Sequence, residues 1–172
     1  LPAASGLLLY GVRDGRTETS VLVRSSAASE VYKNQILQTS SGEQRPAGLQ
    51  GQEIPAGSRR SFNIGEYWTD WNVSTKVVAT GEVICERAMY GPGRVWAHDS
   101  VGVTTPADTW YLAEGCTEGG METWVLVQNP GNAPVSANLI LQTSSGEQRP
   151  AGLQGQEIPA GSRRSFNIGE YW

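Results

Sequence analysis

Short apolar runs rich in β-branched residues recur along the chain, and Gly, Pro, Asn or Ser bounds each of them. In residues 83–90 the side chains alternate, so that one face carries Val83 and Cys85 while the other carries Ile84 and Glu86. This period of two is typical of a half-buried strand, and no segment shows apolar residues at helical spacing over three turns. The pattern predicts almost no helix and strands over residues 73–80, 83–90, 95–103, 109–113, 122–128, 135–143 and 163–168.

Turn signals separate these predicted strands. The Asn-Pro-Gly-Asn at 129–132 combines a fixed φ with residues that tolerate positive φ, so we expect it to close a hairpin. Gly81 and the Gly-Pro-Gly at 91–93 separate three further runs, which predicts that residues 73–103 form a meander of three strands.

One stretch of the chain occurs twice. Residues 36–68, ILQTSSGEQRPAGLQGQEIPAGSRRSFNIGEYW, recur unchanged as residues 140–172, at an offset of 140 − 36 = 104. About seven predicted strands fall within one such period, as expected of an immunoglobulin-like sandwich, and an up-and-down barrel is the competing topology. We therefore predict tandem all-β modules, with a first sandwich repeat over 1–104 (the first copy) and a partial second repeat over 105–172 (the second copy).

The two copies differ mainly in their first 33 aligned positions. Trp110 and Trp124 of the second copy have Gly6 and Ser20 as counterparts. An end repeat faces water where an inner repeat faces a neighbour, so this loss indicates that the first copy is a terminal unit. The near identity of the rest fits either a recent duplication or a sequence averaged over repeats. Candidate intermodule residues are Trp68, Trp71, Trp110 and Trp124.

The second copy has no counterpart of the strands that residues 73–103 supply to the first. A sandwich that lacks them exposes apolar surface and unpaired strand edges. Either further chain of a longer array completes it, or strands of a neighbouring subunit do so and propagate head to tail into an open filament. Copies of the chain itself are the expected partners in both cases.

Charged residues within a predicted strand need partners if they are buried. In residues 83–90, Arg87 falls on one face and Glu86 on the other. Because a buried charge is costly unless it is paired, Arg87 is a candidate partner of Glu114 between the modules, or Glu86 of an Arg across the sheet. The alternative is that one charge faces solvent at a sheet edge.

Two cysteines, Cys85 and Cys116, allow two interpretations. A disulfide would join the end of one module to the start of the next and would require an oxidising compartment. Alternatively, both are buried structural thiols. Val12 stands at the counterpart of Cys116, as expected if no earlier module supplies a partner. Two thiols without clustered histidines make a metal site implausible, and we expect no metal or cofactor.

Candidate catalytic chemistry is scarce. His98, Asp99 and Ser100 are adjacent, but neighbours in a strand point to opposite faces and cannot converge as a triad. No paired carboxylates or phosphate loop can be placed, so we predict that the chain is not an enzyme. Exposed tryptophans could stack on sugar rings, which makes polysaccharide binding the alternative function.

The charge balance argues against nucleic acid as a partner, and the apolar runs argue against a membrane. The formal net charge is −4, and lysine occurs only at Lys33 and Lys76, so no basic stripe exists to bind nucleic acid. No run of 18 apolar residues occurs, so we expect no membrane insertion.

Several strings carry a resemblance to a known group of proteins. They are TWYLAEGCTEGGMETWVLVQNPGNAPV, IPAGSRRSFNIGEY, VSTKVVATGEVICERAMYG and VWAHDSVGVTTPA. The chain thereby resembles the tandem β-sandwich repeat modules of secreted bacterial cell-surface proteins, a domain of unknown function. The resemblance implies an extracellular, β-rich array at the cell surface, and it brings no catalytic residue with it.

Overall fold

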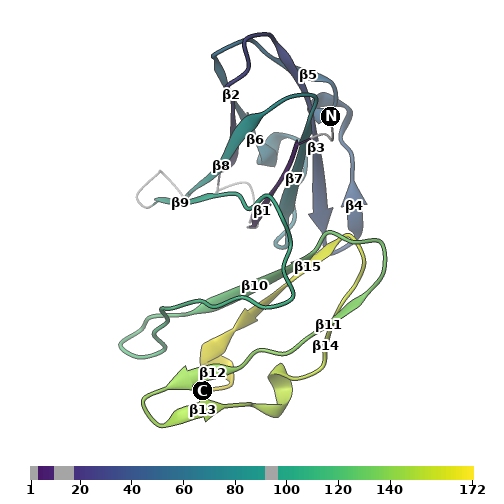
Figure 1. The fold of residues 1–172 in the computed structure, drawn as a ribbon. Coiled ribbons are helices and arrows are strands. Elements are labelled where there is room, and N and C mark those ends of the chain that lie inside the picture. Colours follow the sequence, from purple (N-terminus) through teal and green to yellow (C-terminus); the bar gives the residue numbers. More distant parts are fainter. Residues whose placement is uncertain (1–3, 10–17, 92–96) are drawn as a thin grey trace.

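The first copy contains two antiparallel sheets (Figure 1), and the computed structural model describes residues 4–9, 18–91 and 97–172, with side chains from residue 18 onward. One sheet has the order β1-β7-β3-β4, with β5 also paired to β3. Its strands are β1 (Ala4–Leu9), β3 (Val31–Thr39), β4 (Gly42–Gln44), β5 (Gln52–Ile54) and β7 (Ser74–Ala79). The other sheet, in the order β6-β2-β8-β9, consists of β2 (Glu18–Ser25), β6 (Arg59–Asn63), β8 (Val83–Tyr90) and β9 (Ala97–Val101).

Inward-facing residues from both sheets form one hydrophobic core. Val21 and Val23 of β2 belong to the same buried cluster as Leu37 of β3 and Val77 of β7. Because side chains alternate along a strand, Arg24 of β2 faces outward and is exposed. A core that draws on both sheets makes the first copy a β-sandwich.

The second copy consists of three two-stranded antiparallel sheets. They pair β10 (Trp124–Asn129) with β15 (Ser162–Asn167), β11 (Val135–Ala137) with β14 (Gln156–Ile158), and β12 (Leu141–Thr143) with β13 (Gly146–Gln148). A second, smaller core lies between them, and its buried members are Leu139, Leu153, Ile158, Phe166 and Ile168.

Identical sequence forms identical local structure in the two copies. The short 3-10 helices η1 (Ala47–Leu49) and η2 (Ile64–Glu66) of the first copy recur as η4 (Ala151–Leu153) and η5 (Ile168–Glu170). In both copies a tyrosine ring packs closely against a glycine of the preceding 3-10 helix. A Cβ added to Gly48 would lie 2.7 Å from the Tyr67 ring, and a Cβ added to Gly152 would lie 2.6 Å from the Tyr171 ring. Local sequence therefore determines these elements in either environment.

The prediction of an all-β chain with scarcely any helix is confirmed. The helices of the described ranges are single 3-10 turns, and none is long and apolar enough to cross a membrane. The predicted strand at 109–113 is not a strand, and the run at 135–143 is split into β11 and β12. The hydrophobic pattern does not predict β4, β5 and their counterparts β13 and β14, because these are three-residue strands without an extended apolar run.

Two predicted hairpins are wrong. Residues 129–132 connect β10 to β11, and Gly81 lies between β7 and β8, but each connection joins strands of different sheets. The physical reason is the sandwich itself, in which consecutive strands cross from one sheet to the other to cover the same core. β8 and β9 do pair antiparallel as expected, while residues 92–96 of their connection lie outside the described residues.

Candidate functional site

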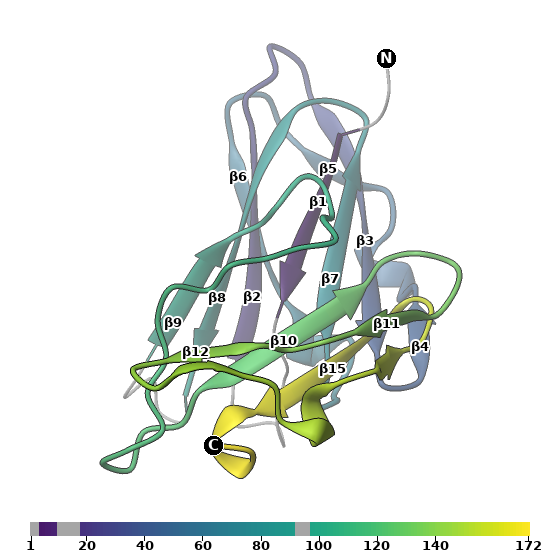
Figure 2. The same ribbon diagram turned by 60° about the horizontal axis from the view of Figure 1, so that its bottom comes forward.

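The two copies meet at a joint formed by Gln128, Arg163 and Ser165 of the second copy and by Gln38 and residues 71–73 of the first. β10 and β15 lie across the end of the first copy at which β3 and β4 meet (Figures 1 and 2). The outward face of the β10–β15 pair therefore supplies one side of the joint.

Arg163 is the central residue of the joint. Its guanidinium donates to the Trp71 carbonyl at 3.0 Å, to Asn72 Oδ1 at 2.8 Å and to the Val73 carbonyl at 3.5 Å. The side chain is only 3% exposed. A guanidinium is always charged, so burying it this deeply requires several acceptors, which the first copy supplies.

Polar contacts on either side of Arg163 extend the joint. Ser165 Oγ donates to Asn72 Oδ1 at 3.0 Å, and Gln128 Nε2 donates to Gln38 Oε1. Asp70 stabilises the loop at residues 71–73, because its carboxylate accepts from the backbone N–H of Asn72 at 3.0 Å and from Ser40 Oγ at 2.7 Å. The joint is thus a specific hydrogen-bonded contact between prearranged groups.

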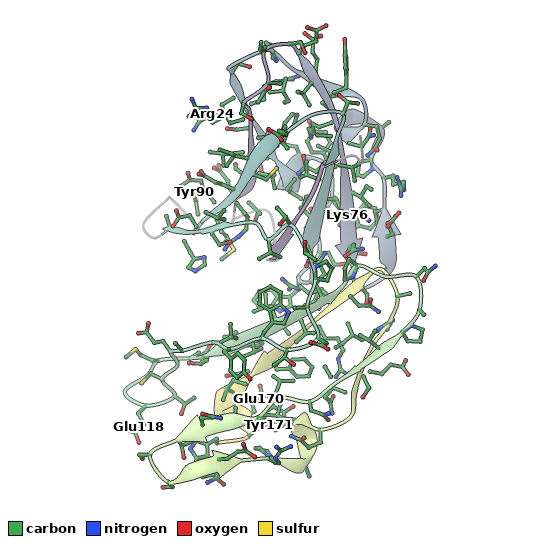
Figure 3. All side chains as sticks on the ribbon, viewed as in Figure 1. Arg24, Lys76, Tyr90, Glu118, Glu170 and Tyr171 are labelled. Atoms are coloured by element: carbon green, nitrogen blue, oxygen red, sulfur yellow. The ribbon has the colours of Figure 1, made fainter. Side chains whose placement is uncertain are left out.

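The corresponding face of the first copy, on the β2–β6 pair, is exposed to solvent. Arg59 and Ser61 occupy the positions of Arg163 and Ser165 in the repeated sequence, and both are exposed. Arg24 replaces Gln128 and extends into solvent at the edge of the first copy (Figure 3). Arg24 and Arg59 face each other across the β2–β6 pair, so two like charges are adjacent on this face.

The second copy has an open face, which we define by Trp110, Tyr111, Val125, Val127 and Leu141. Trp110 is 56% exposed and Tyr111 is 89% exposed, in a segment whose counterpart in the first copy is strand β1. Val125, Val127 and Leu141 are only partly buried, whereas their counterparts Val21, Val23 and Leu37 are fully buried. This geometry agrees with the expected apolar surface and unpaired edges. The second copy nevertheless has a small core of its own.

The four predicted interface tryptophans occupy different environments. Trp71 is half exposed and accepts from Arg163 through its carbonyl, so it belongs to the joint. Trp68 packs against the core of the first copy. Trp110 donates to the Ala107 carbonyl, and Trp124 donates to Glu122 within its own copy. Trp71 contributes its backbone carbonyl to the joint, which an aromatic pattern does not predict, and Arg163, Ser165 and Gln128 were missed because they carry no unusual signal in the sequence.

The predicted Cys85–Cys116 disulfide is not present. Both thiols are free, with Cys85 buried in the core of the first copy and Cys116 exposed in the second. Cys116 lies beside Thr123, to which its amide donates at 2.8 Å. The side chain of Cys85 points between two sheets, so a bridge between the copies would require it to leave that core. The alternative of two buried thiols holds for Cys85 alone.

Arg87 and Glu114 are not brought together. Arg87 is buried and donates to Ser100 Oγ at 2.9 Å and to the His98 carbonyl at 3.5 Å, both on neighbouring β9. Glu114 lies exposed in the second copy. Because β8 pairs with β9, the Arg87 guanidinium lies beside acceptors of its own sheet and does not need a partner from the other copy. Desolvation by burial and then the charge of Arg87 lower the pKa of His98.

A buried polar cluster in the first copy was also missed. Lys33 is fully buried, its Nζ donates to Gln35 Oε1 at 2.6 Å, and it lies 3.4 Å from the centroid of the Phe62 ring. Burial, followed by the charge of Arg60, lowers the pKa of Lys33 to about 7, and burial raises the pKa of the Cys85 thiol to about 11. The signal was available, since the second copy has the apolar residues Ala137 and Leu139 at these positions.

The described residues offer no metal site, since no three His, Cys, Asp or Glu side chains gather within them. No protein-family model and no curated protein matches the chain. Among solved structures, the chain is similar to the one in "Crystal Structure of Thermotoga maritima 1070", with a TM-score of 0.48 and 9% identity over 60% of this chain and 96% of that one. A likeness of this size carries no argument about function.

Proposed function

We propose that this chain is an extracellular structural repeat protein whose immunoglobulin-like modules, repeated every 104 residues, pack head to tail into a surface stalk, fibre or filament. The observation that carries the proposal is the joint around Arg163, which is buried against the first copy while its sequence-identical counterpart Arg59 is exposed. One face of a copy thus contacts the opposite end of another, the heterologous geometry from which linear assemblies are built.

Parts of both sides of the joint recur in the sequence, although the first copy has Arg24 at the position of Gln128. Arg163 and Ser165 recur as Arg59 and Ser61, and Gln38 recurs as exposed Gln142. A chain of copies can therefore reuse the same contact, as in other repeat proteins in which each unit touches only its neighbours. The resemblance to secreted cell-surface repeats supports an extracellular location.

Polysaccharide binding is the weaker alternative. Its support is the exposure of Trp71 and Trp110, which could stack on sugar rings. These residues lie on different copies, and the exposure of Trp110 accompanies the missing strand partner of its segment. Exposure of two separate tryptophans is therefore the sole support for this alternative.

Negative-stain electron microscopy of the native material tests the array. We expect threads of regularly spaced beads, each bead of the size of one module. Isolated compact particles in material of native length would contradict the proposal. The mass under nonreducing denaturation then separates the two origins of a thread, because 18.5 kDa subunits indicate assembly of separate chains and a much larger mass indicates one long array.

A further inference from the structure

Each strand edge that is paired in the first copy but unpaired in the second is one that β7 or β8 fills in the first. In the first copy, β7 pairs with β1 on one side and with β3 on the other, and β8 pairs with β2. In the second copy, residues 108–113 at the position of β1 form no strand, and β10 at the position of β2 pairs with β15 alone among the described strands. The missing contacts are thus those of one continuous segment.

The burial of the core shows the same division. Ile158 and Phe166, which belong to the repeated stretch, are as buried as their counterparts Ile54 and Phe62. Val125 and Val127 are only partly buried. Their counterparts in the first copy, Val21 and Val23 of β2, lie on a strand that pairs with β8. The exposed apolar surface therefore lies where β7 and β8 are absent.

We propose that the open face is an acceptor for a two-strand segment with the residue pattern of β7 and β8, in which one strand pairs with β11 and β12 and the other pairs with β10. This inference rests on the proposed array, because it names the partner that completes the second copy within it. The inward positions of the occupant are mostly apolar, as are Val77 and Ala79 in β7 and Cys85 and Met89 in β8, with Arg87 buried between the last two in the first copy.

The first copy specifies the register of the occupant. There, Glu86 of β8 lies opposite Leu22, so its equivalent lies opposite Leu126 of β10. Thr75 of β7 lies between Leu8 and Leu37, so its equivalent lies between Leu112 and Leu141. A shift by one residue would turn every apolar side chain of the occupant away from the core, so this register is strongly preferred.

The geometry favours an occupant joined directly to Trp172. The Trp172 amide donates to the Ile168 carbonyl at 3.1 Å, as the Trp68 amide donates to Ile64 at 3.0 Å, so the chain leaves both 3-10 helices in the same way. In the first copy only four residues, 69–72, then lie between Trp68 and buried Val73. Another molecule could supply the strands only by withdrawing β7 and β8 from its own core, which would expose Val77 and Cys85.

The test is the full chain extended after Trp172 by a second copy of residues 69–104. Hydrogen exchange should then show slowing by about 100-fold or more at amides of 109–112 and at those β10 amides that do not bond to β15, because they become part of a ladder. The matched control carries V77D and C85D in the added copy alone, which places carboxylates in the core and should leave the exchange of 1–172 unchanged.

Unchanged exchange with the native extension would overturn the inference, and so would slowing that is equal in the control. Slowing that appears only together with a doubled mass in sedimentation would also overturn it, because the strands would then come from another molecule. The two proposals can fail separately. Threads of the native material together with an extension that does not pair would support the array and overturn the acceptor. An extension that pairs, without threads of the native material, would support the acceptor and overturn the array.

Discussion

At the scale of residues, Lys33 and Gln35 place an amine and an amide in an interior where the second copy has Ala137 and Leu139. Their hydrogen bond satisfies one donor and one acceptor, but Gln35 Nε2 is buried without a partner. Burial of polar groups costs free energy that a single hydrogen bond does not fully offset. The first copy therefore carries a destabilising polar pair that its fold does not require.

Replacing both residues by apolar ones, K33M with Q35L, should raise the free energy of unfolding at pH 7 by roughly 1–3 kcal/mol. Met approximates the volume of Lys, and Leu is the residue of the second copy. The single variant K33M should gain less, because it leaves the buried Gln35 oxygen without its donor. Urea denaturation followed by tryptophan fluorescence measures the effect, and an equal loss of stability in both variants would contradict it.

The pH dependence of stability identifies the amine as the cause. The pKa of Lys33 is about 7 in the folded chain against an ordinary 10.5, so the unfolded chain binds more protons over this range and stability rises with pH. The pKa of Cys85 is raised from 9.0 to about 11, which opposes the rise above pH 9. We expect the wild type to gain stability from pH 7 to pH 9 relative to K33M/Q35L, and parallel curves would refute this assignment.

At the scale of elements, the β2–β6 pair shows how one substitution changes a strand face. Arg24 and Arg59 lie directly opposite each other, whereas the same place in the second copy pairs Gln128 with Arg163. Neither Arg24 nor Arg59 has an ion-pair partner within the part of the chain that the structure describes. Burying two opposed guanidinium groups would be far costlier than burying one, so the first copy is poorly suited to accept a preceding module on this face.

The variant R24Q should stabilise the chain by roughly 0.2–1 kcal/mol at low salt, because like charges opposite each other destabilise a strand pair. Thermal unfolding at low salt and at about 1 M salt is the measurement, and the gain should vanish at high salt, where charges are screened. R24K, which keeps the charge, is the control. A gain of equal size in R24K would point to a cause other than charge.

At the scale of the whole molecule, the joint relates the two cores, and Arg163 makes most of its hydrogen bonds. Arg163 bonds to three consecutive residues of the first copy, Trp71, Asn72 and Val73, across a boundary that no sheet of the described residues bridges. The relative placement of the copies therefore depends on a few hydrogen bonds to a charged group, which are individually stronger than neutral ones.

The variant R163A should loosen the joint and destabilise the chain on the order of 3 kcal/mol, because buried acceptors of the first copy lose their donor. R59A removes the identical side chain from an exposed site, so it should stay within about 0.5 kcal/mol of the wild type. Denaturation measures the stability, and small-angle X-ray scattering measures the placement of the copies. Scattering curves that coincide for R163A and R59A would show that Arg163 does not hold the joint.

Particular elements show how far the sequence could be interpreted. The alternation in residues 83–90 predicted β8 with its bounds, since a period of two is set by the strand itself. The turn at 129–132 was recognised as a turn but assigned to the wrong pairing, because a turn does not specify the sheet that its flanking strands join. Arg163 could not be identified as a contact residue, since the identical Arg59 is exposed and only the surroundings differ.

The sequence by itself determined most of the longer strands, the scarcity of helix and the repeated local elements, because these depend on side-chain alternation and on contacts within a few residues. Only the tertiary structure decided which strands pair, which cysteine is buried and which of two identical arginines is buried in the joint. Those outcomes depend on segments that are far apart in the chain, and a residue's own neighbours in sequence carry no information about which of them will lie beside it.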